Sequence, residues 1–202
     1  MPRILVLFAH PAFEKSRVHK EMVRYASHIE GVTFHDLYET YPDYDIDRVR
    51  EQNLLLQHDI IVMQHPFYWY SCPAILKEWQ DLVLEHGWAY GRGGVHLSGK
   101  YLFNAITAGG REDVYQETGH NRFTIRQLLT PFDQTAYLCR MTYLPPFVVH
   151  DTHRMNHANI EIHAQQYQQL LKGLQEGKIS VTDLGKVKYL NDLVPVTKAL
   201  NL

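Results

Sequence analysis

Residues 4–9 read Ile-Leu-Val-Leu-Phe-Ala, and this apolar run ends at His10-Pro11. A short run without polar alternation is typical of a parallel strand that is buried on both faces of its sheet. Residues 59–64, Asp-Ile-Ile-Val-Met-Gln, have the same character and end in the same way, at His65-Pro66. Each run is followed by a loop and then by apolar residues at helical spacing, so the chain predicts an α/β domain with a parallel sheet.

Strand and helix patterns alternate along the rest of the chain. The first helix is expected over residues 16–29, with Gly31 as its cap, and the next over residues 47–57, with Asp47 as N-cap. A further helix is expected over residues 73–84, because Pro73 favours a helix start. The remaining expected elements are strands at 32–37, 100–107 and 139–149, a partly helical stretch at 125–132 and a final helix at 160–175.

This order of elements is typical of a flavodoxin-like three-layer sandwich, an α/β fold in which a five-stranded parallel sheet has the order 2-1-3-4-5. The fifth strand, within residues 139–149, is interrupted by Pro145-Pro146. No repeat or linker divides the chain, so we expect one flavodoxin-like domain over residues 1–177. Residues 178–202 have weak periodicity and are expected to form a tail that packs on the domain or on a partner.

The composition excludes several classes of protein. The 202 residues carry 20 Lys and Arg against 22 Asp and Glu, and a net charge of −2 argues against a nucleic-acid partner. The apolar run at residues 4–9 is too short for a signal peptide, and no stretch approaches the roughly 20 apolar residues that span a bilayer. We therefore expect a cytoplasmic protein, with a peripheral position on the cytoplasmic face of the inner membrane left open.

The loop after the first strand, residues 9–18, brings a hydroxyl and a cation to the start of a helix. Free backbone N–H groups and the positive end of the helix dipole favour a phosphate at such a place. Ser16 can add a hydroxyl donor and Arg17 a positive charge, although Ser16 can equally be a simple N-cap. The chain lacks both G-x-G-x-x-G and G-x-x-x-x-G-K-[ST], so neither a Rossmann dinucleotide site nor a P-loop is indicated.

Two further loops fall at the same edge of the expected sheet. The loop after the third strand carries four consecutive aromatic residues, Phe67-Tyr68-Trp69-Tyr70, which suit a flat heteroaromatic ligand. Some of these rings can instead belong to the core or to a dimer contact. The loop after the fourth strand carries Gly109-Gly110, where the backbone can approach a ligand closely and its N–H groups can stabilise negative charge. A plain turn is an equally good interpretation of this Gly-Gly pair alone.

Four stretches resemble a known family. They are Ala9-His10-Pro11 with Ser16, the run Gln-His-Pro-Phe-Tyr-Trp-Tyr-Ser-Cys-Pro-Ala-Ile-Leu-Lys-Glu-Trp at residues 64–79, residues 99–110, and Pro131-Phe132 with Cys139-Arg140-Met141. Together they span residues 3–150 and resemble the flavodoxin-like NAD(P)H:quinone oxidoreductase family. The likeness is strongest to the ancillary subunits of bacterial glutathione-gated potassium-efflux systems.

The resemblance implies a homodimer that transfers two electrons from NAD(P)H to quinones, and a potassium-efflux transporter as a partner. It implies FMN as the cofactor, because the chain lacks the longer tail of FAD-using relatives. His10, Ser16 and Val18 match the positions that hold the ribityl phosphate, and Tyr115 and His120 match a catalytic pair near the flavin. The implied flavin contacts are Pro66, Phe67, Tyr68 and Trp69 along one edge, with Thr107, Gly109 and Gly110 at the pyrimidine end.

Other chemistry is weaker in this sequence. His153 and His157 share a spacing that can place two imidazoles on one helix face, but no zinc motif surrounds them and we expect no metal site. Cys72 is more typical of a space-filling thiol than of a redox group. Three functions remain to be compared: an FMN-dependent quinone reductase, a regulatory subunit of a transporter, and a flavin-free binding module on the same fold.

Overall fold

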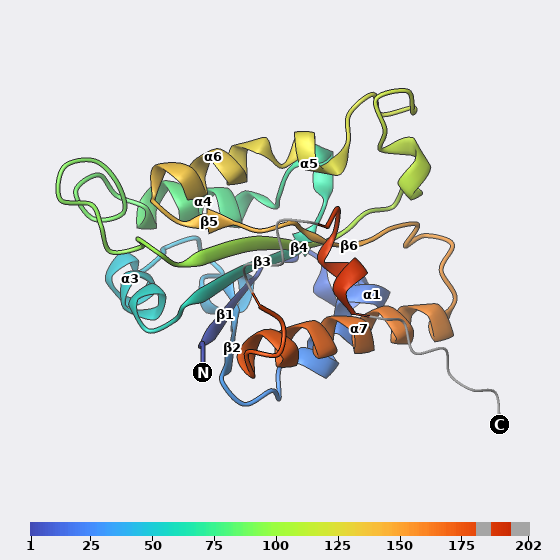
Figure 1. The fold of residues 1–202 in the computed structure, drawn as a ribbon, viewed down its shortest axis with the longest axis horizontal. Helices are drawn as coiled ribbons and strands as arrows, with labels where there is room; N and C mark the ends of the chain where they lie inside the picture. The colour runs from blue at the N-terminus through green and yellow to red at the C-terminus, as the bar shows by residue number, and fades with distance from the viewer. Residues whose placement is uncertain (181–186, 195–202) are drawn as a thin grey trace.

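The computed structural model describes residues 1–180 and 187–194. Its parallel strands form one sheet in the order β2-β1-β3-β4-β5, with β6 also paired to β4, and Figure 1 shows this sheet running through the middle of the molecule. The strands are β1 (Ile4–Phe8), β2 (Val32–Asp36), β3 (Ile60–Pro66), β4 (Tyr101–Thr107), β5 (Thr142–Tyr143) and β6 (Phe147–Val149). The expected order 2-1-3-4-5 is confirmed, and the fifth position is shared by two short strands on either side of Pro145-Pro146.

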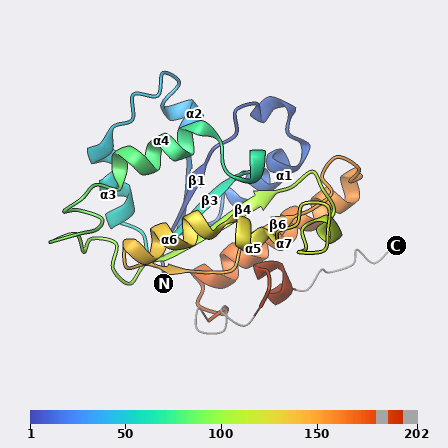
Figure 2. The same ribbon diagram turned by 90° about the horizontal axis from the view of Figure 1, so that it is seen from above.

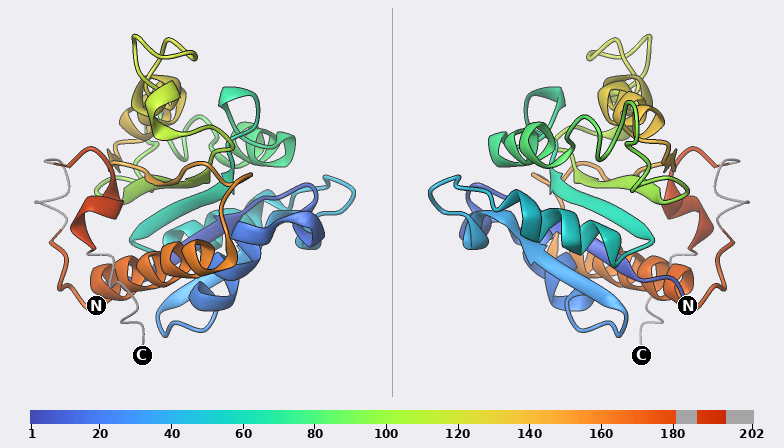
Figure 3. Two further views of the ribbon diagram at one scale, coloured as in Figure 1. Left: turned by 90° about the vertical axis from the view of Figure 1, so that its right-hand side faces the viewer. Right: turned by 90° about the vertical axis from the view of Figure 1, so that its left-hand side faces the viewer.

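Helices cover both faces of the sheet and complete three layers (Figures 2 and 3). The helices α1 (Arg17–Ala26) and α7 (His157–Gln175) pack on the face that carries Ile4 and Val6 of β1. The opposite face, which carries Leu5 and Leu7, is covered by α2 (Leu37–Thr40), α3 (Arg48–Leu56), α4 (Ala74–Val83), α5 (Ile125–Leu128) and α6 (Thr130–Leu138). Alternate strand residues therefore enter two separate cores, which explains why the strand sequences are apolar without interruption.

The strand register places four connecting segments at one edge. Phe8 lies opposite Gln64, Pro66 lies opposite Thr107, and Thr107 lies opposite Val149. The segments that follow β1, β3, β4 and β6 consequently begin side by side at the carboxyl edge of the sheet. In open α/β sheets this edge is where ligands bind.

Several local expectations hold and some do not. Asp47 caps α3 as expected, since its carboxylate accepts a 3.0 Å hydrogen bond from the backbone N–H of Arg50. Gly31 does not cap α1, because that helix already ends at Ala26 with Ser27 as its C-cap, and Gly31 instead adopts a φ of +78° in the turn into β2. Residue 37 begins the short helix α2 rather than ending a strand, because the Asp36 carboxylate caps the helix at that point.

A buried carboxylate lies within the core between α3 and α4. Glu51 is fully buried and accepts hydrogen bonds from Nε2 of His35 at 2.9 Å, the hydroxyl of Tyr41 at 2.6 Å and Nε1 of Trp79 at 2.8 Å. Burial alone would raise the pKa of this carboxyl, but the hydrogen bonds outweigh that effect and lower the pKa of Glu51. The network satisfies a charge that would otherwise destabilise the core.

The described part of the C-terminal region packs on the domain. A short turn of helix, η5 (Leu190–Leu193), lies against β6 and α7, as the red segment of Figure 1 shows. Leu190 is fully buried, and its backbone N–H donates a 3.0 Å hydrogen bond to the carbonyl of Pro146. Within residues 1–180 and 187–194, no helix is both long and apolar enough to cross a bilayer.

Candidate ligand-binding cleft

A cleft of about 630 Å³ opens at the carboxyl edge of the sheet, within the usual size range of small-molecule sites. Four segments line it: the loops after β1, β3 and β4, and the segment between β6 and α7. The lining residues are His10, Ala12, Lys15, Ser16, Arg17, Val18, Pro66, Phe67, Tyr68, Trp69, Thr107, Gly109, Thr152 and His153.

The structure brings together nearly all the residues that the sequence marks for the cofactor. Every one of them lines the cleft except Gly110, which follows the cleft residue Gly109 directly. A Cβ atom at Gly110 would lie 3.0 Å from Cγ2 of Val114 and 3.2 Å from Cε2 of Tyr115. Gly110 therefore lets the loop that carries Tyr115 fold back closely against the end of β4.

The start of α1 forms one end of the cleft. Ser16 is the N-cap, and its hydroxyl accepts a 3.2 Å hydrogen bond from the backbone N–H of His19. The first backbone N–H groups of a helix have no partner within it, so those at Arg17 and Val18 are suited to an anion, in addition to the helix dipole. Ser16 is thus an N-cap in fact, and this role is compatible with an anion at the same helix end.

His10 is a neutral donor at the edge of this cleft. Its Nδ1 accepts a 3.1 Å hydrogen bond from the backbone N–H of Ala12, and burial lowers the pKa of its imidazole. A neutral ring that accepts at Nδ1 carries its proton on Nε2. His10 is therefore equipped to donate a hydrogen bond through Nε2.

A buried hydrogen-bonded chain fixes the role of Thr107. The Tyr167 hydroxyl donates to Oε1 of Gln64 at 3.0 Å, and the Gln64 amide nitrogen lies 3.3 Å from Nδ1 of His19. Nε2 of His19 lies 3.0 Å from the Thr107 hydroxyl oxygen. Burial holds the pKa of His19 well below its usual value, so the ring is neutral and donates to Thr107 through Nε2. The Thr107 hydroxyl proton is then free to be donated into the cleft.

The aromatic loop after β3 divides into inward and outward rings. Phe67 is buried and packs edge-on against Tyr115 with ring centroids 6.1 Å apart, whereas Trp69 is 93% exposed at the rim of the cleft. Trp69 and Tyr70 have φ angles of 49° and 61°, a left-handed conformation that is strained for aromatic residues. Such strain is found preferentially at functional sites. The alternative that some of these rings belong to the core holds for Phe67, which is part of the buried cluster, but not for Trp69.

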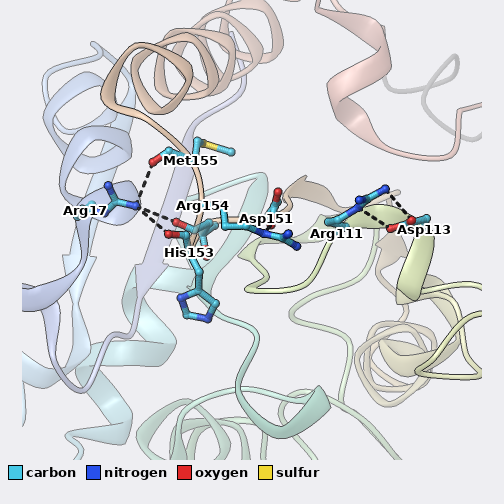
Figure 4. A network of polar contacts seen from close by, with 8 residues as sticks. Arg17, Arg111, Asp113, Asp151, His153, Arg154 and Met155 are labelled. Atoms are coloured by element: carbon cyan, nitrogen blue, oxygen red, sulfur yellow. Dashed lines mark hydrogen bonds and ion pairs between the residues drawn. The ribbon is translucent and has the colours of Figure 1, made fainter.

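The segment between β6 and α7 is a part of the cleft that the sequence analysis did not select. Arg17 attaches it to α1 by donating from Nη2 to the carbonyl oxygens of Thr152 and Met155 at 3.1 and 3.0 Å. Figure 4 shows the Arg17 side chain pointing toward His153 and Met155. The His153 imidazole covers Gly109 so closely that a Cβ atom there would lie 2.3 Å from its Nε2. The signal that could have identified this segment is its position after a strand at the same sheet edge.

The two expected catalytic residues are placed differently. Tyr115 is buried beside Phe67, and desolvation together with the nearby Tyr70 raises the pKa of its phenol. His120 is exposed on the loop that follows. The imidazole that packs on Tyr115 belongs instead to His150, with ring centroids 5.7 Å apart.

Metal and thiol chemistry find little support in the described part of the chain. Among residues 1–180 and 187–194, no group of three or more His, Cys, Asp or Glu side chains is arranged to hold a metal ion. Burial raises the pKa of the Cys139 thiol to about 11, and desolvation also raises the pKa of Cys72. Both thiols are therefore poor nucleophiles near neutral pH.

Comparison with known proteins identifies the family. The family model described as "Flavodoxin-like fold" matches residues 2–171. The chain belongs to this flavodoxin-like family. It is 46% identical to the glutathione-regulated potassium-efflux system ancillary protein KefG of Serratia proteamaculans. The match extends over 166 residues, which are 82% of this chain and 91% of that protein. The likeness to potassium-efflux ancillary subunits is thereby confirmed.

Solved structures agree with this assignment. General stress protein 14 of Treponema denticola, in complex with FMN, is 37% identical and has a TM-score of 0.82, with 86% of this chain and 99% of that chain covered. An NADPH-quinone reductase from P. pentosaceus is 32% identical with a TM-score of 0.75, covering 83% of this chain and 96% of that chain. The flavodoxin-like family therefore includes relatives that bind FMN and relatives named as quinone reductases.

Proposed function

We propose that this protein is an FMN-dependent NAD(P)H:quinone oxidoreductase that acts as an ancillary subunit of a glutathione-gated potassium-efflux transporter. The observation that carries the proposal is the cleft itself, which joins a helix N-terminus, an aromatic loop and a Gly-Gly loop at one sheet edge. Relatives with these names, an FMN complex among them, support it.

The residues present fit a flavin mononucleotide. The N-terminal amides of α1 and the Ser16 hydroxyl would hold the phosphate, with Lys15 and Arg17 supplying positive charge nearby. His10 and Thr107 each present a donor whose proton is fixed by the hydrogen bonds behind it. The groups at the start of α1 and His10 would bind the phosphate and the polyol chain, which are rich in acceptor oxygens, and Thr107 would donate to the ring at its pyrimidine end.

The other half of the cleft suits a flat ring. Pro66, Phe67, Tyr68 and Trp69 would border its edge, and the backbone N–H groups of Gly109 and Gly110 would stabilise negative charge at its pyrimidine end. When bound, FMN supplies the hydride chemistry that connects a nicotinamide to a quinone. The protein residues position the partners and exclude water around them.

Tyr115 is the proposed donor to the quinone. Its burial raises the pKa of the phenol, so the hydroxyl stays protonated at neutral pH and can donate to an oxygen on which negative charge develops. His120 is the second proposed donor, from the exposed loop that follows Tyr115. NAD(P)H and the quinone would occupy the same face in turn, in ping-pong order.

A second copy of the chain would complete this site. Tyr68, Trp69 and Tyr70 are between 46% and 93% exposed at the cleft rim, and Phe123 is 46% exposed. Exposed aromatic rings of this kind are typical of protein interfaces. We propose a homodimer through this rim, and a position on the cytoplasmic face of the inner membrane beside the transporter.

Titration of the purified protein with FMN tests the proposal. We expect stoichiometric binding, a flavin absorbance spectrum and quinone-dependent oxidation of NADH or NADPH by the loaded protein. Protein that stays colourless in excess FMN would contradict the proposal and support a flavin-free module. If the holoprotein binds the transporter's cytoplasmic domain but reduces no quinone, its role is that of a non-catalytic regulatory module.

A further inference from the structure

Two buried polar groups behind the cleft have no evident role in the fold. His150 directly follows β6, and both of its ring nitrogens are buried. Among the described residues neither nitrogen makes a well-formed hydrogen bond, although the backbone of Gly110 lies close enough to oppose the effect of burial on the imidazole pKa. The hydroxyl of Tyr189, from the C-terminal region, is buried and likewise makes no well-formed hydrogen bond within the described residues, although Lys188 lies close enough to affect its pKa. Buried unsatisfied polar groups are rare, and each one indicates an ordered water or a functional role.

These groups belong to a line of rings that ends in the cleft. The Tyr189 and His150 ring centroids are 5.7 Å apart, and His150 and Tyr115 are separated by the same distance. Tyr115 then packs edge-on against the cleft residue Phe67 at 6.1 Å. The C-terminal segment is therefore connected to the cleft by consecutive ring contacts.

An ion pair ties the same segment to the backbone near Tyr115. Nζ of Lys188 lies 2.6 Å from Oε1 of Glu112, and it also lies 4.9 Å from the centre of the Tyr189 ring. Glu112 begins the helical turn η3 (Glu112–Val114), which immediately precedes Tyr115. Residues 188 and 189 thus contact both the ring line and the loop that carries Tyr115.

The segment is anchored firmly enough to act as a wall. The side chain of Asn191 accepts a hydrogen bond from the Val148 N–H at 2.8 Å and donates one to the Val148 carbonyl at 3.1 Å. Gln166 of α7 donates to the carbonyls of Asn191 and Val194, both at 2.9 Å. This segment lies beyond residues 2–171, the part of the chain that the family model matches.

We infer that Lys188 and Tyr189 form the rear wall of the active site, and that His150 and Tyr189 are positioning residues for the Tyr115 phenol. The inference rests on the proposed role of Tyr115 as the donor. Burial lowers the pKa of His150, so its neutral ring can donate and accept at once. A buried water between His150 and Tyr189 would satisfy both groups and fix the orientation of the ring that packs on Tyr115.

A fluorine label at position 115 tests this without any bound flavin. Replacing Tyr115 with 3-fluorotyrosine in the apoprotein gives one ¹⁹F resonance, whose shift and titration report the surroundings of the phenol. We expect Tyr189→Ala to move this resonance and to lower the pKa of the fluorophenol, because water enters beside the ring. Lys188→Glu should also move the resonance but raise the pKa, because it places a second carboxylate beside Glu112. The double variant Lys188→Glu with Glu112→Lys should restore both values, and Lys178→Glu, which alters a separate exposed pair with Glu176, should change neither.

Turnover of the loaded enzyme provides a second readout. We expect the Lys188→Glu variant to lose about tenfold in kcat with FMN affinity within twofold of the parent, and the charge-exchanged double variant to recover. If Tyr189→Ala does not fold, the variants of the exposed residues Lys188 and Glu112 still test whether this segment positions the Tyr115 phenol. An unchanged ¹⁹F resonance and titration in Lys188→Glu would overturn the inference, whereas failure to bind FMN or reduce quinone would contradict only the proposed function.

Discussion

Nη2 of Arg17 donates a 3.1 Å hydrogen bond to the carbonyl oxygen of Thr152, across 135 positions of the chain (Figure 4). Arg17 is the first residue of α1, and Thr152 lies in the segment between β6 and α7. The same nitrogen reaches the carbonyl of Met155 at 3.0 Å and that of His153 at a longer 3.5 Å. An arginine expected to supply charge to a phosphate therefore also holds one wall of the cleft.

Replacement of Arg17 should weaken ligand binding through this wall. We expect Arg17→Met to lower FMN affinity by about fivefold, roughly 1 kcal/mol, which is modest because the side chain is exposed. Arg17→Lys should recover only part of the loss, since an ammonium lacks the planar fork that reaches several carbonyls. Fluorescence titration with FMN measures the change. Arg154→Met, which removes the exposed pair with Asp151 in the same segment, is the matched control and should have little effect.

The contact between Gly109 and His153 gives a second prediction. A methyl group at position 109 would lie 2.3 Å from Nε2 of His153, so Gly109→Ala must displace the imidazole or the loop. Overpacking of this kind costs about 1–3 kcal/mol, and we expect FMN affinity to fall about tenfold. The double variant Gly109→Ala with His153→Ala should recover most of the lost FMN affinity. If the double variant binds no better than the single one, steric conflict with His153 is not the cause.

The hydrogen-bonded series from Tyr167 to Thr107 predicts that a substitution within it lowers the stability of the protein even when no ligand is bound. Tyr167→Phe leaves Oε1 of Gln64 buried without its donor, which should lower the free energy of unfolding by about 1–2 kcal/mol. Because Gln64 can then reorient, the donor state of Thr107 is no longer fixed, and FMN affinity should fall two- to fivefold. Urea denaturation of the apoprotein measures the first effect. Tyr137→Phe, at a position that is 76% exposed, should change neither quantity.

The succession of strands and helices could be predicted from sequence because it depends on local patterns, and the sheet order 2-1-3-4-5 followed from the fold of which that succession is typical. Residues 4–9 and 60–63 are apolar without alternation, and short runs of this kind are typical of a strand buried on both faces. The loops after those strands could be located for the same reason. The cleft residues Ser16, Phe67 and Gly109 followed from that placement combined with the chemistry of their side chains.

The remaining features depend on contacts between distant segments. Glu51 reads as a solvent-exposed acid in a helix, and only the approach of His35, Tyr41 and Trp79 makes its burial possible. The interruption at Pro145-Pro146 is visible in the sequence, but the course of the following segment past the cleft depends on its contacts with Arg17 and Gly109, which no local pattern specifies. The proximity of His150 to Tyr115 is likewise a product of the sheet, since β6 pairs with β4.

Buried histidines should make the protein sensitive to acid. His65 is fully buried, and desolvation lowers its pKa from 6.5 to about 4. A histidine with a lowered pKa contributes stability that is present above pH 6.5 and is lost as the pH falls, because the unfolded chain takes up the proton first. For His65 alone the loss between pH 7 and pH 4 is about 3 kcal/mol. His10 and His19, whose pKa values burial also lowers, act in the same direction.

His65→Gln separates this titration from the other acid-sensitive groups. Nδ1 of His65 donates to the Pro66 carbonyl at 3.0 Å, so its Nε2 accepts the 3.0 Å hydrogen bond from Asn104. Glutamine also offers a donor group and an acceptor group but does not titrate, and its amide carries one more N–H than the neutral imidazole. The variant should therefore be less stable at pH 7 and lose less stability on acidification. Urea denaturation at pH 7, 6, 5 and 4.5 gives the slope of the free energy of unfolding against pH for the parent and for the variant. Equal slopes for parent and variant would mean that His65 takes up its proton in the folded protein as readily as in the unfolded chain.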